Sequence, residues 1–169
     1  MIKKIIRKYK LIKNPVEYWR SRGMKIGEGC EIYPTANFGS EPYLITVGNH
    51  VRINEGVKFV THDGGVWVLR GYIDTMRDID MFGKIAVGNN VHIGTNAIIM
   101  PNVEIGNNCV IGCGAIVTKS IPDNSVAVGV PARVIETIEE YKEKNSNKFV
   151  RTKMLSPKEK KCYLQEKYK

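Results

Sequence analysis

Aliphatic side chains recur every six positions in the middle of the chain. The recurring residues are Val87, Ile93, Ile99, Ile105, Ile111 and Val117. A small or aliphatic residue follows four positions after each of the first five, at Val91, Ala97, Val103, Cys109 and Ala115. An amphipathic helix repeats about every 3.6 residues and a half-buried strand every two, so neither produces this spacing. The period of six predicts a solenoid whose coils each have three short faces.

The geometry of such a coil explains the pattern. Each hexapeptide supplies one short strand and one sharp corner, and the aliphatic residue points inward and stacks on its equivalent about 4.8 Å away in the next coil. Glycine and asparagine tolerate the unusual backbone angles of tight corners. The competing interpretation is two antiparallel hairpins with Asn-rich turns. Six consecutive matches to one period favour the solenoid.

The same pattern is present further upstream. It begins near Met24 and slips in phase between Ser40 and Ile45. The matching residues are Ile26, Ile32, Phe38, Val47, Ile53 and Phe59. We therefore predict a solenoid domain of about four coils over residues 24–135. Residues 65–84 interrupt it, and a long excursion inside so regular a repeat usually has a function. Trp67 and Met81 lie in this excursion, and a neighbouring subunit is a natural place for them.

Helix signals flank the solenoid. Asn14, Pro15 and Glu17 are arranged as a cap, a first-turn proline and a third-position acid, and Gly23 should end this helix. Residues 1–23 thus form a basic, helical N-terminal segment. A second helix is expected from Val134 to about Lys144, and Ser156 opens a last one. Residues 136–169 are therefore predicted to be a basic, helical tail.

The net charge of +9 is concentrated at the two ends. Residues 1–25 hold nine Lys and Arg against one Glu, a charge of +8. Residues 26–135 hold seven basic and ten acidic side chains, and residues 136–169 hold ten and six, so these parts carry −3 and +4. Basic ends can attract an anionic membrane surface. A solvated, solubilising charge is the favoured interpretation. A nucleic-acid partner is not expected, because no aromatic-interleaved motif accompanies the charge.

Location is inferred from weaker signals. The chain has no run of about 18 apolar residues that would span a membrane, and its first 14 residues lack the uninterrupted apolar core of a secretion signal. Cys30 and Cys109 fall at small-residue positions of the repeat, and Cys113 lies in a third repeat, so they resemble packing thiols. These features favour a cytoplasmic protein, with the inner face of the membrane as a further location.

His62 is the main candidate for chemistry. It stands where a coil gives way to the excursion, so a rigid strand can hold its ring in an exposed position. A neutral imidazole titrates close to the pH at which a general base must work. The alternative is a structural histidine, which is the commoner role for a single His. His50 and His92 occupy regular corner or strand positions and are expected to be surface residues.

Several motifs resemble the hexapeptide-repeat acyltransferases. The resemblance is carried by the six-residue pattern, by THDG before the excursion and by IGCGAIVTKSIPDNSVAVGVPARVI, and it covers about residues 24–138. These proteins are mainly-β, left-handed parallel β-helices that use acetyl-CoA and form trimers with sites between subunits. The first half, with ANFGSEPYLITVGNHVRI and GVKFVTHDGG, resembles members that O-acetylate sugars in capsule or lipopolysaccharide synthesis.

The resemblance also implies roles for individual residues. His62 would take the proton from an acceptor hydroxyl, which attacks the thioester, and a backbone N–H would stabilise the oxyanion. The positions matching cofactor contacts are Thr95, Cys113, Thr118, Lys119 and Arg133. Lys119 and Arg133 suit charge-assisted contacts to phosphate. A basic residue found three positions further on in sugar acetyltransferases is Glu136 here, so that phosphate contact is not carried over.

On the acceptor side, Asn37 in ANFG matches a substrate-binding asparagine of the sugar enzymes. Glu41 and Asp63 carry weaker signals. Either of these acids could orient His62 or bind a sugar hydroxyl, and each could instead be a solvated turn residue. The sequence leaves these alternatives open.

Two other protein classes share parts of this pattern. The γ-class carbonic anhydrases bind zinc through two closely spaced His and a third upstream. The three His here are spaced 12 and 30 residues apart, so no metal site is predicted. A non-catalytic scaffold would need neither Thr118 and Lys119 nor Arg133. We therefore expect a homotrimer that moves acetyl from acetyl-CoA to a sugar hydroxyl, with an amino-sugar nitrogen or an antibiotic hydroxyl as alternative acceptors.

Overall fold

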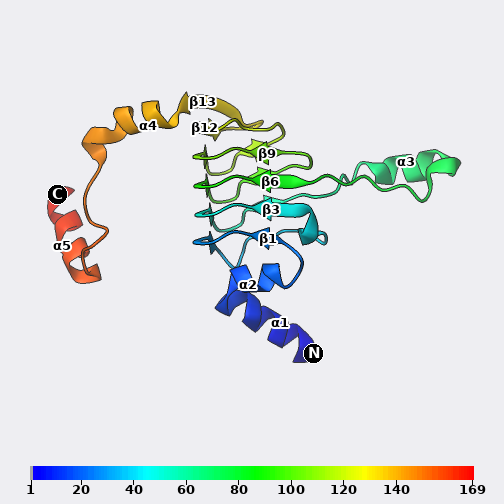
Figure 1. The fold of residues 1–169 in the computed structure, drawn as a ribbon, viewed down its shortest axis with the longest axis horizontal. Helices are drawn as coiled ribbons and strands as arrows, with labels where there is room; N and C mark the ends of the chain where they lie inside the picture. The colour runs from blue at the N-terminus through cyan, green and yellow to red at the C-terminus, as the bar shows by residue number, and fades with distance from the viewer. Residues whose placement is uncertain (1) are drawn as a thin grey trace.

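The computed structural model describes residues 2–169, and the side chains from residue 5 onward. Its centre is a stack of coils with three flat faces (Figure 1). The first face contains β1 (Lys25–Ile26), β3 (Ile45–Val47), β6 (Ile85–Val87) and β9 (Glu104–Ile105). The second contains β2 (Glu31–Ile32), β4 (Arg52–Ile53), β7 (His92–Ile93), β10 (Val110–Ile111), β12 (Ser125–Val128) and β13 (Arg133–Thr137). The third contains β5 (Lys58–Phe59), β8 (Ile98–Ile99) and β11 (Ile116–Val117).

The predicted period of six is confirmed by the strand register. Ile53 pairs with Ile93, Ile93 with Ile111, and Phe59 with Ile99, in every case between parallel strands. These inward residues form columns along the axis of the stack and are almost completely buried. Burying one such side chain contributes about 1.5–3 kcal/mol. The short strands therefore hold together through the columns rather than through their own length.

One corner of the prism, between the first and second faces, is tied together by Asn and Asp side chains. Asn49, Asn89, Asn107 and Asp123 each accept a hydrogen bond through Oδ1 from a backbone N–H one coil below, at 2.7–2.8 Å. The non-glycine residues with positive φ are His50, Asn90, Asn96, Asn102, Asn108 and Asn124. Asparagine tolerates this left-handed backbone better than most residues. These side chains and backbone angles keep successive corners in register.

Length varies only at the third corner, where the chain passes from the third face to the first. Successive inward residues are six apart at the other two corners. At the third corner the pairs are Phe38 and Val47, Phe59 and Val87, Ile99 and Ile105, and Val117 and Ile121, separated by 9, 28, 6 and 4 residues. The expected phase slip is thus a three-residue insertion, and it folds as the short helix η1 (Pro42–Leu44).

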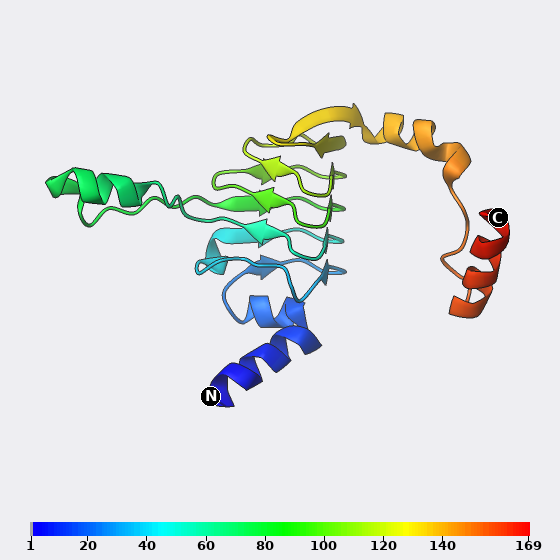
Figure 2. The same ribbon diagram turned by 180° about the vertical axis from the view of Figure 1, so that it is seen from behind.

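The excursion leaves the same corner one coil later. It contains the helix α3 (Val66–Tyr72) and the helical turn η2 (Asp74–Met76), and it extends away from the stack as an arm (Figures 1 and 2). Many apolar side chains of the arm face solvent. They are Trp67, Val68, Leu69, Tyr72, Met81 and Phe82. The arm therefore has little packing of its own within one chain.

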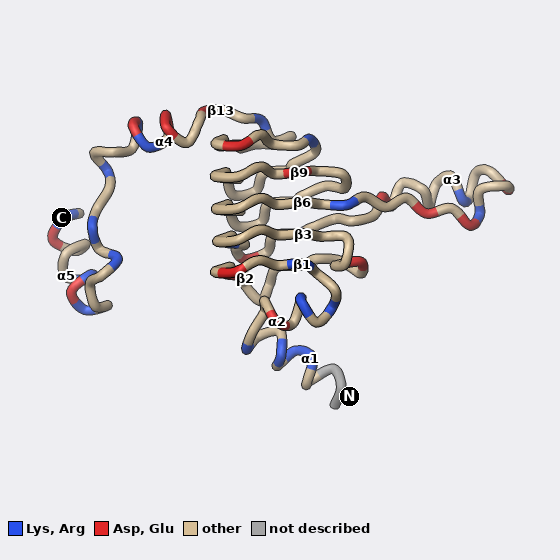
Figure 3. Tube along the Cα trace, viewed as in Figure 1, with Lys and Arg blue, Asp and Glu red and all other residues tan. Residues whose placement is uncertain are grey.

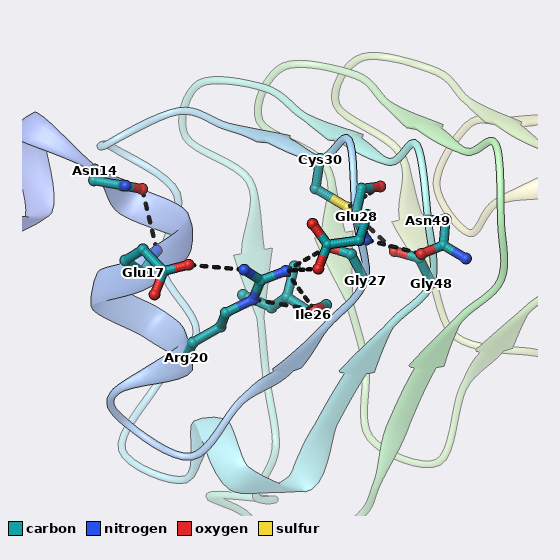
Figure 4. Close-up of polar contacts among 9 residues, drawn as sticks. All are labelled: Asn14, Glu17, Arg20, Ile26, Gly27, Glu28, Cys30, Gly48 and Asn49. Carbon is teal, nitrogen blue, oxygen red and sulfur yellow. Dashed lines mark hydrogen bonds and ion pairs between the residues drawn. The ribbon is translucent and has the colours of Figure 1, made fainter.

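Two helices close the N-terminal end of the stack. These are α1 (Ile2–Lys13) and α2 (Pro15–Arg20), and Asn14 caps α2 as expected. Trp19 of α2 lies edge-on to Phe38 with ring centroids 4.9 Å apart, and Phe38 stacks on Phe59. Arg20 donates to the carbonyl oxygens of Ile26 and Gly27 and also pairs with Glu17 and Glu28 (Figure 4). These contacts anchor α2 to the first coil.

The C-terminal end differs from the expected helix over Val134–Lys144. Residues 133–137 instead form β13, which pairs antiparallel with β12. The helix α4 (Ile138–Asn145) begins later because Thr137 and Glu140 form a capping box there. The expected cap at Ser156 is confirmed at the start of α5 (Pro157–Lys167), which follows the helical turn η3 (Ser146–Lys148). The tail leaves the stack on the side opposite the arm (Figure 2).

Candidate active site

His62 lies where the third face ends and the arm begins. The two legs of the arm meet here: the N–H of Asp63 donates to Met81 at 2.9 Å, and the N–H of Gly83 donates to Thr61 at 2.8 Å. His62 itself forms an antiparallel bridge with Phe82. The backbone of His62 is therefore held on both sides, while its side chain remains 49% exposed.

Glu41 comes to His62 from one coil below. Its Oε2 accepts a 2.8 Å hydrogen bond from the hydroxyl of Thr61 and lies 3.2 Å from His62 Nδ1. The Glu41 side chain is mostly buried, and Thr61 is completely buried. The three-residue insertion at the third corner positions this carboxylate, because Glu41 directly precedes η1.

The surroundings of Glu41 favour its charged form. Hydrogen bonds from Ser40, from Thr61 and from His62 hold the pKa of Glu41 below its ordinary value, although burial acts in the opposite direction. An ionised carboxylate can only accept, so the hydrogen on the His62 ring belongs on Nδ1 when the ring is neutral. The other nitrogen, Nε2, is then left as a proton acceptor.

The other two acceptor-side candidates stabilise local turns. Asp63 Oδ1 accepts from the N–H of Gly65 at 2.7 Å, and Asn37 Oδ1 accepts from the N–H of Gly39 at 2.9 Å. Asp63 also lines the cleft at His62, whereas Asn37 does not. Of the three acceptor-side residues, the structure therefore brings Glu41 to the His62 ring.

The cleft around His62 has a volume of about 360 Å³ and opens to solvent. It is lined by Ser40, Glu41, His62, Asp63, Gly64, Val66, Trp67, Arg70, Asp80, Met81 and Phe82. Sequence reasoning missed Thr61, Arg70 and Asp80. Thr61 carried a usable signal, because a buried hydroxyl next to a candidate base needs a polar partner. Arg70 and Asp80 pair with each other across the arm, and their spacing in the sequence carries no such signal.

The residues expected to contact the cofactor lie toward the C-terminal end of the stack. Thr95 and Cys113 occupy equivalent corners one coil apart, where the N–H of Gly114 donates to the Thr95 carbonyl at 2.8 Å. Thr118 lies on the rim of a smaller cavity that it shares with Asp63 and Phe82. A continuous surface thus leads from the His62 cleft to the end of β11.

Lys119 and Arg133 are both exposed beyond this cavity. Arg133 lies at the start of β13, where its Nη1 donates to the carbonyl of Ala132 at 2.9 Å. Glu136 stands on this strand where sugar acetyltransferases carry a basic residue. Its carboxylate pairs with Lys144 Nζ at 2.9 Å. Lys144 therefore places a cation beside the position where the sequence alone showed only an acid.

Comparisons with known proteins agree with this architecture. Residues 84–119 match the family model of the bacterial transferase hexapeptide (six repeats). The chain is 50% identical over 152 residues to protein CapG of Staphylococcus aureus, and this match covers 89% of this chain and 87% of that protein. It is 37% identical over 120 residues to the galactoside O-acetyltransferase of Escherichia coli K12, covering 70% of this chain and 57% of that enzyme.

A solved structure of galactoside acetyltransferase in complex with coenzyme A gives a TM-score of 0.56 at 30% identity, and the match covers 84% of this chain and 82% of that one. This chain belongs to the hexapeptide-repeat acetyltransferases. The three parallel faces are those of a left-handed parallel β-helix, and the protein is an acetyl-CoA-dependent acetyltransferase. Among its described helices, none combines the length and apolar content needed to cross a membrane.

The remaining histidines of this acetyltransferase differ from His62. His50 is exposed at a positive-φ corner and its Nδ1 bonds to Asn90 at 2.8 Å. His92 was expected at the surface but is half-buried on β7, where Nε2 lies 3.2 Å from the Asn54 amide. Burial and the nearby Arg52 lower the pKa of His92, so its ring stays neutral.

The geometry assigns Glu41 a positioning role that can be tested. Glu41→Ala is expected to lower kcat about ten-fold, because His62 loses the acceptor that orients it. Glu41→Gln keeps an acceptor oxygen and should recover part of this loss. Since Gln cannot stabilise an imidazolium, the acidic limb of the kcat/KM profile should move to lower pH in Glu41→Gln. Full pH–rate profiles measure both effects.

The lowered pKa of Glu41 determines whether Glu41 itself can produce the acidic limb of the pH profile. A lowered pKa keeps the carboxylate ionised over the range in which an imidazole gains its proton. Glu41 protonation therefore cannot produce the wild-type acidic limb. A Glu41→Gln profile that superimposes on the wild type at reduced amplitude would show that the carboxylate is only structural.

Proposed function

We propose that this acetyltransferase moves an acetyl group from acetyl-CoA to a sugar hydroxyl during the synthesis of a capsule, lipopolysaccharide or other surface polysaccharide. The observation that carries the proposal is the His62–Glu41 pair, which leaves Nε2 as a base in an open cleft. Similarity to a galactoside O-acetyltransferase and to CapG supports a sugar acceptor. An amino-sugar nitrogen or an antibiotic hydroxyl is the alternative acceptor.

The proposed reaction follows from the orientation of the His62 ring. Nε2 accepts the proton of the acceptor hydroxyl as its oxygen bonds to the acetyl carbonyl carbon. Glu41 stabilises the imidazolium that forms. A backbone N–H on a coil stabilises the negative charge on the carbonyl oxygen. When the carbon–sulfur bond breaks, the imidazolium returns the proton to the departing thiolate, so the base is regenerated.

Apart from Asn37, the residues proposed to hold the acceptor line the His62 cleft, and those proposed to hold the cofactor lie further along the stack. Trp67, Asp63 and Asp80 present an aromatic ring and two carboxylates, a suitable set for a ring that has hydroxyls and apolar faces. Asn37 is also proposed to contact the acceptor, but its Oδ1 would first have to give up the hydrogen bond from the Gly39 N–H. Acetyl-CoA would lie along Thr95, Cys113 and Thr118, with Lys119 and Arg133 at its phosphates. Lys119 and Arg133 are exposed, and basic side chains suit phosphate groups.

Thioester consumption with a panel of acceptors tests this function. Free sugars, sugar nucleotides and lipid-linked sugars are compared with amino sugars and with antibiotic hydroxyls. We expect consumption with a sugar acceptor and a product whose acetyl group is released by mild alkali, because esters hydrolyse there and amides do not. Consumption only with amines or antibiotics would contradict the proposal.

We further propose that the working form is a homotrimer whose arms reach neighbouring subunits. Exposed apolar residues on the arm motivate this, since Tyr72 and Val68 have no covering partner within the described chain. Light scattering is expected to give three times the mass of one chain. Val68→Asp/Tyr72→Asp should dissociate it, while Met154→Asp, at another exposed apolar residue, should not. A stable wild-type monomer at working concentration would contradict both the trimer and a shared site.

A further inference from the structure

The helix α1 has one face that no part of the described chain covers. Ile5, Ile6, Tyr9 and Ile12 are 49–63% exposed. Spacings of four and three place Ile5, Tyr9 and Ile12 on one side of a helix, with Ile6 beside them. Scattered single apolar residues on a surface need no explanation, but an apolar stripe along about two turns does.

The opposite face of α1 is fixed to the body of the protein. Leu11 is partly buried against the core. Arg7 Nε donates to the hydroxyl of Tyr18 at 2.5 Å, and its guanidinium lies 6.0 Å from the centre of that ring. Tyr18 belongs to α2, which Arg20 anchors to the first coil (Figure 4). The exposed stripe is therefore held pointing away from the stack.

The charge on α1 indicates what covers the stripe. The helix contains six Lys and Arg and no acidic residue. Figure 3 shows basic positions and no acidic one along the described part of this helix. By helical position Lys8 and Lys10 flank the stripe on either side, and Lys13 lies at its end with its ammonium 5.7 Å from the Tyr9 ring centre. Exposed Arg22 and Lys25 add positive charge at the same end of the molecule. Self-association through α1 would bring like charges together, whereas an anionic surface complements them.

We propose that α1 binds the surface of an anionic lipid bilayer. An apolar stripe bordered by lysines is the arrangement of helices that lie in the plane of a membrane interface, where the stripe enters the boundary between headgroups and acyl chains. Aromatic rings with a polar tip, such as Tyr9, favour that boundary. A nucleic acid would use the charge but leave the aliphatic stripe unexplained. The inference does not depend on the acceptor or on the trimer.

Flotation of the full-length protein with lipid vesicles tests this proposal. Vesicles of phosphatidylcholine alone are compared with vesicles containing about one-third phosphatidylglycerol. We expect binding to the anionic vesicles that weakens strongly in 0.5 M salt, since each basic residue near such a surface strengthens binding roughly five-fold. Absence of binding to anionic vesicles at low salt would overturn the proposal.

Two double variants separate the apolar stripe from the charge. Ile5→Ser/Tyr9→Ser keeps every charge and should weaken vesicle binding at least about ten-fold. Lys8→Glu/Lys10→Glu should weaken it to a similar degree, whereas Lys160→Glu/Lys161→Glu on α5 makes the same change in net charge and should have little effect. All six residues are exposed, so circular dichroism and acetyltransferase activity in solution should be unchanged.

Each contrary outcome has a definite meaning. Unchanged vesicle binding by Ile5→Ser/Tyr9→Ser would show a purely electrostatic contact, as with RNA, and would overturn insertion of the stripe. Equal losses from the α1 and α5 charge variants would show that net charge alone is responsible. A change in oligomeric state caused by Ile5→Ser/Tyr9→Ser would show that a second copy of the chain covers the stripe.

Discussion

Replacing His62 with alanine is expected to lower the turnover number about 10²–10⁴-fold, because the reaction would lose the general base that we propose. The change should not unfold the protein, since the His62 side chain is half-exposed and its backbone is held by the arm. Steady-state kinetics with saturating acetyl-CoA measures the loss. Circular dichroism and thermal unfolding establish that the variant is folded.

His50→Asn is the matched control for that experiment. The equivalent corners of later coils already carry asparagine at Asn90, Asn108 and Asn124, all with positive φ. His50→Asn therefore removes an exposed imidazole while keeping the corner and its side-chain ladder. We expect nearly wild-type turnover. A folded His62→Ala variant that performs as well as His50→Asn would remove His62 from the mechanism.

The second large effect is expected at Arg133, at the C-terminal end of the stack. Arg133→Ala should raise the KM for acetyl-CoA roughly 10- to 150-fold with little change in kcat, because a charged hydrogen bond contributes about 1.5–3 kcal/mol. A contact remote from the thioester binds the ground state and the transition state alike. Arg151→Ala, another exposed arginine, should leave KM unchanged. The measurement is KM with acetyl-CoA varied.

Dephospho-coenzyme A, which lacks the 3′-phosphate, tests which phosphate of the cofactor Arg133 contacts. If Arg133 holds the 3′-phosphate, the wild type should discriminate between the two forms of the coenzyme while Arg133→Ala barely does. Equal discrimination by both proteins would show that the phosphate is held elsewhere. Lys119 and Lys144 are then the next residues to exchange, since Lys144 places its ammonium beside Glu136 on the strand that begins with Arg133.

The regular part of the fold could be predicted because one physical constraint repeats. A narrow prism needs an inward aliphatic residue at every sixth position, so Val87–Val117 determines strand, corner and register together. Residues 65–84 do not follow the six-residue repeat, and their sequence did not predict the seven-residue helix α3. The strand β13 was mistaken for helix because its pairing with β12 is a tertiary contact that outweighs local preference.

The candidate site was only partly predictable for a related reason. The position of His62 at a junction is visible in the sequence, but its partner lies 21 residues away. The choice between Glu41 and Asp63 depends on which side chain the stacking of coils brings to the ring. Asp63 is the neighbour in sequence and is occupied by the N–H of Gly65, whereas Glu41 is the neighbour in space.

The confinement of length variation to the third corner has a consequence for how this enzyme can change. Successive inward residues are six apart at the other two corners, and the corner between the first and second faces carries a side-chain ladder that a single inserted residue would put out of register. The third accommodates separations from 4 to 28 residues without displacing one inward column. Grafting a different arm between Asp63 and Met81, the pair that closes the arm, should therefore alter which acceptors are admitted while the coils and His62 stay in place. Selectivity for a different acceptor can therefore arise by replacing the arm alone, while the stack of coils is unchanged.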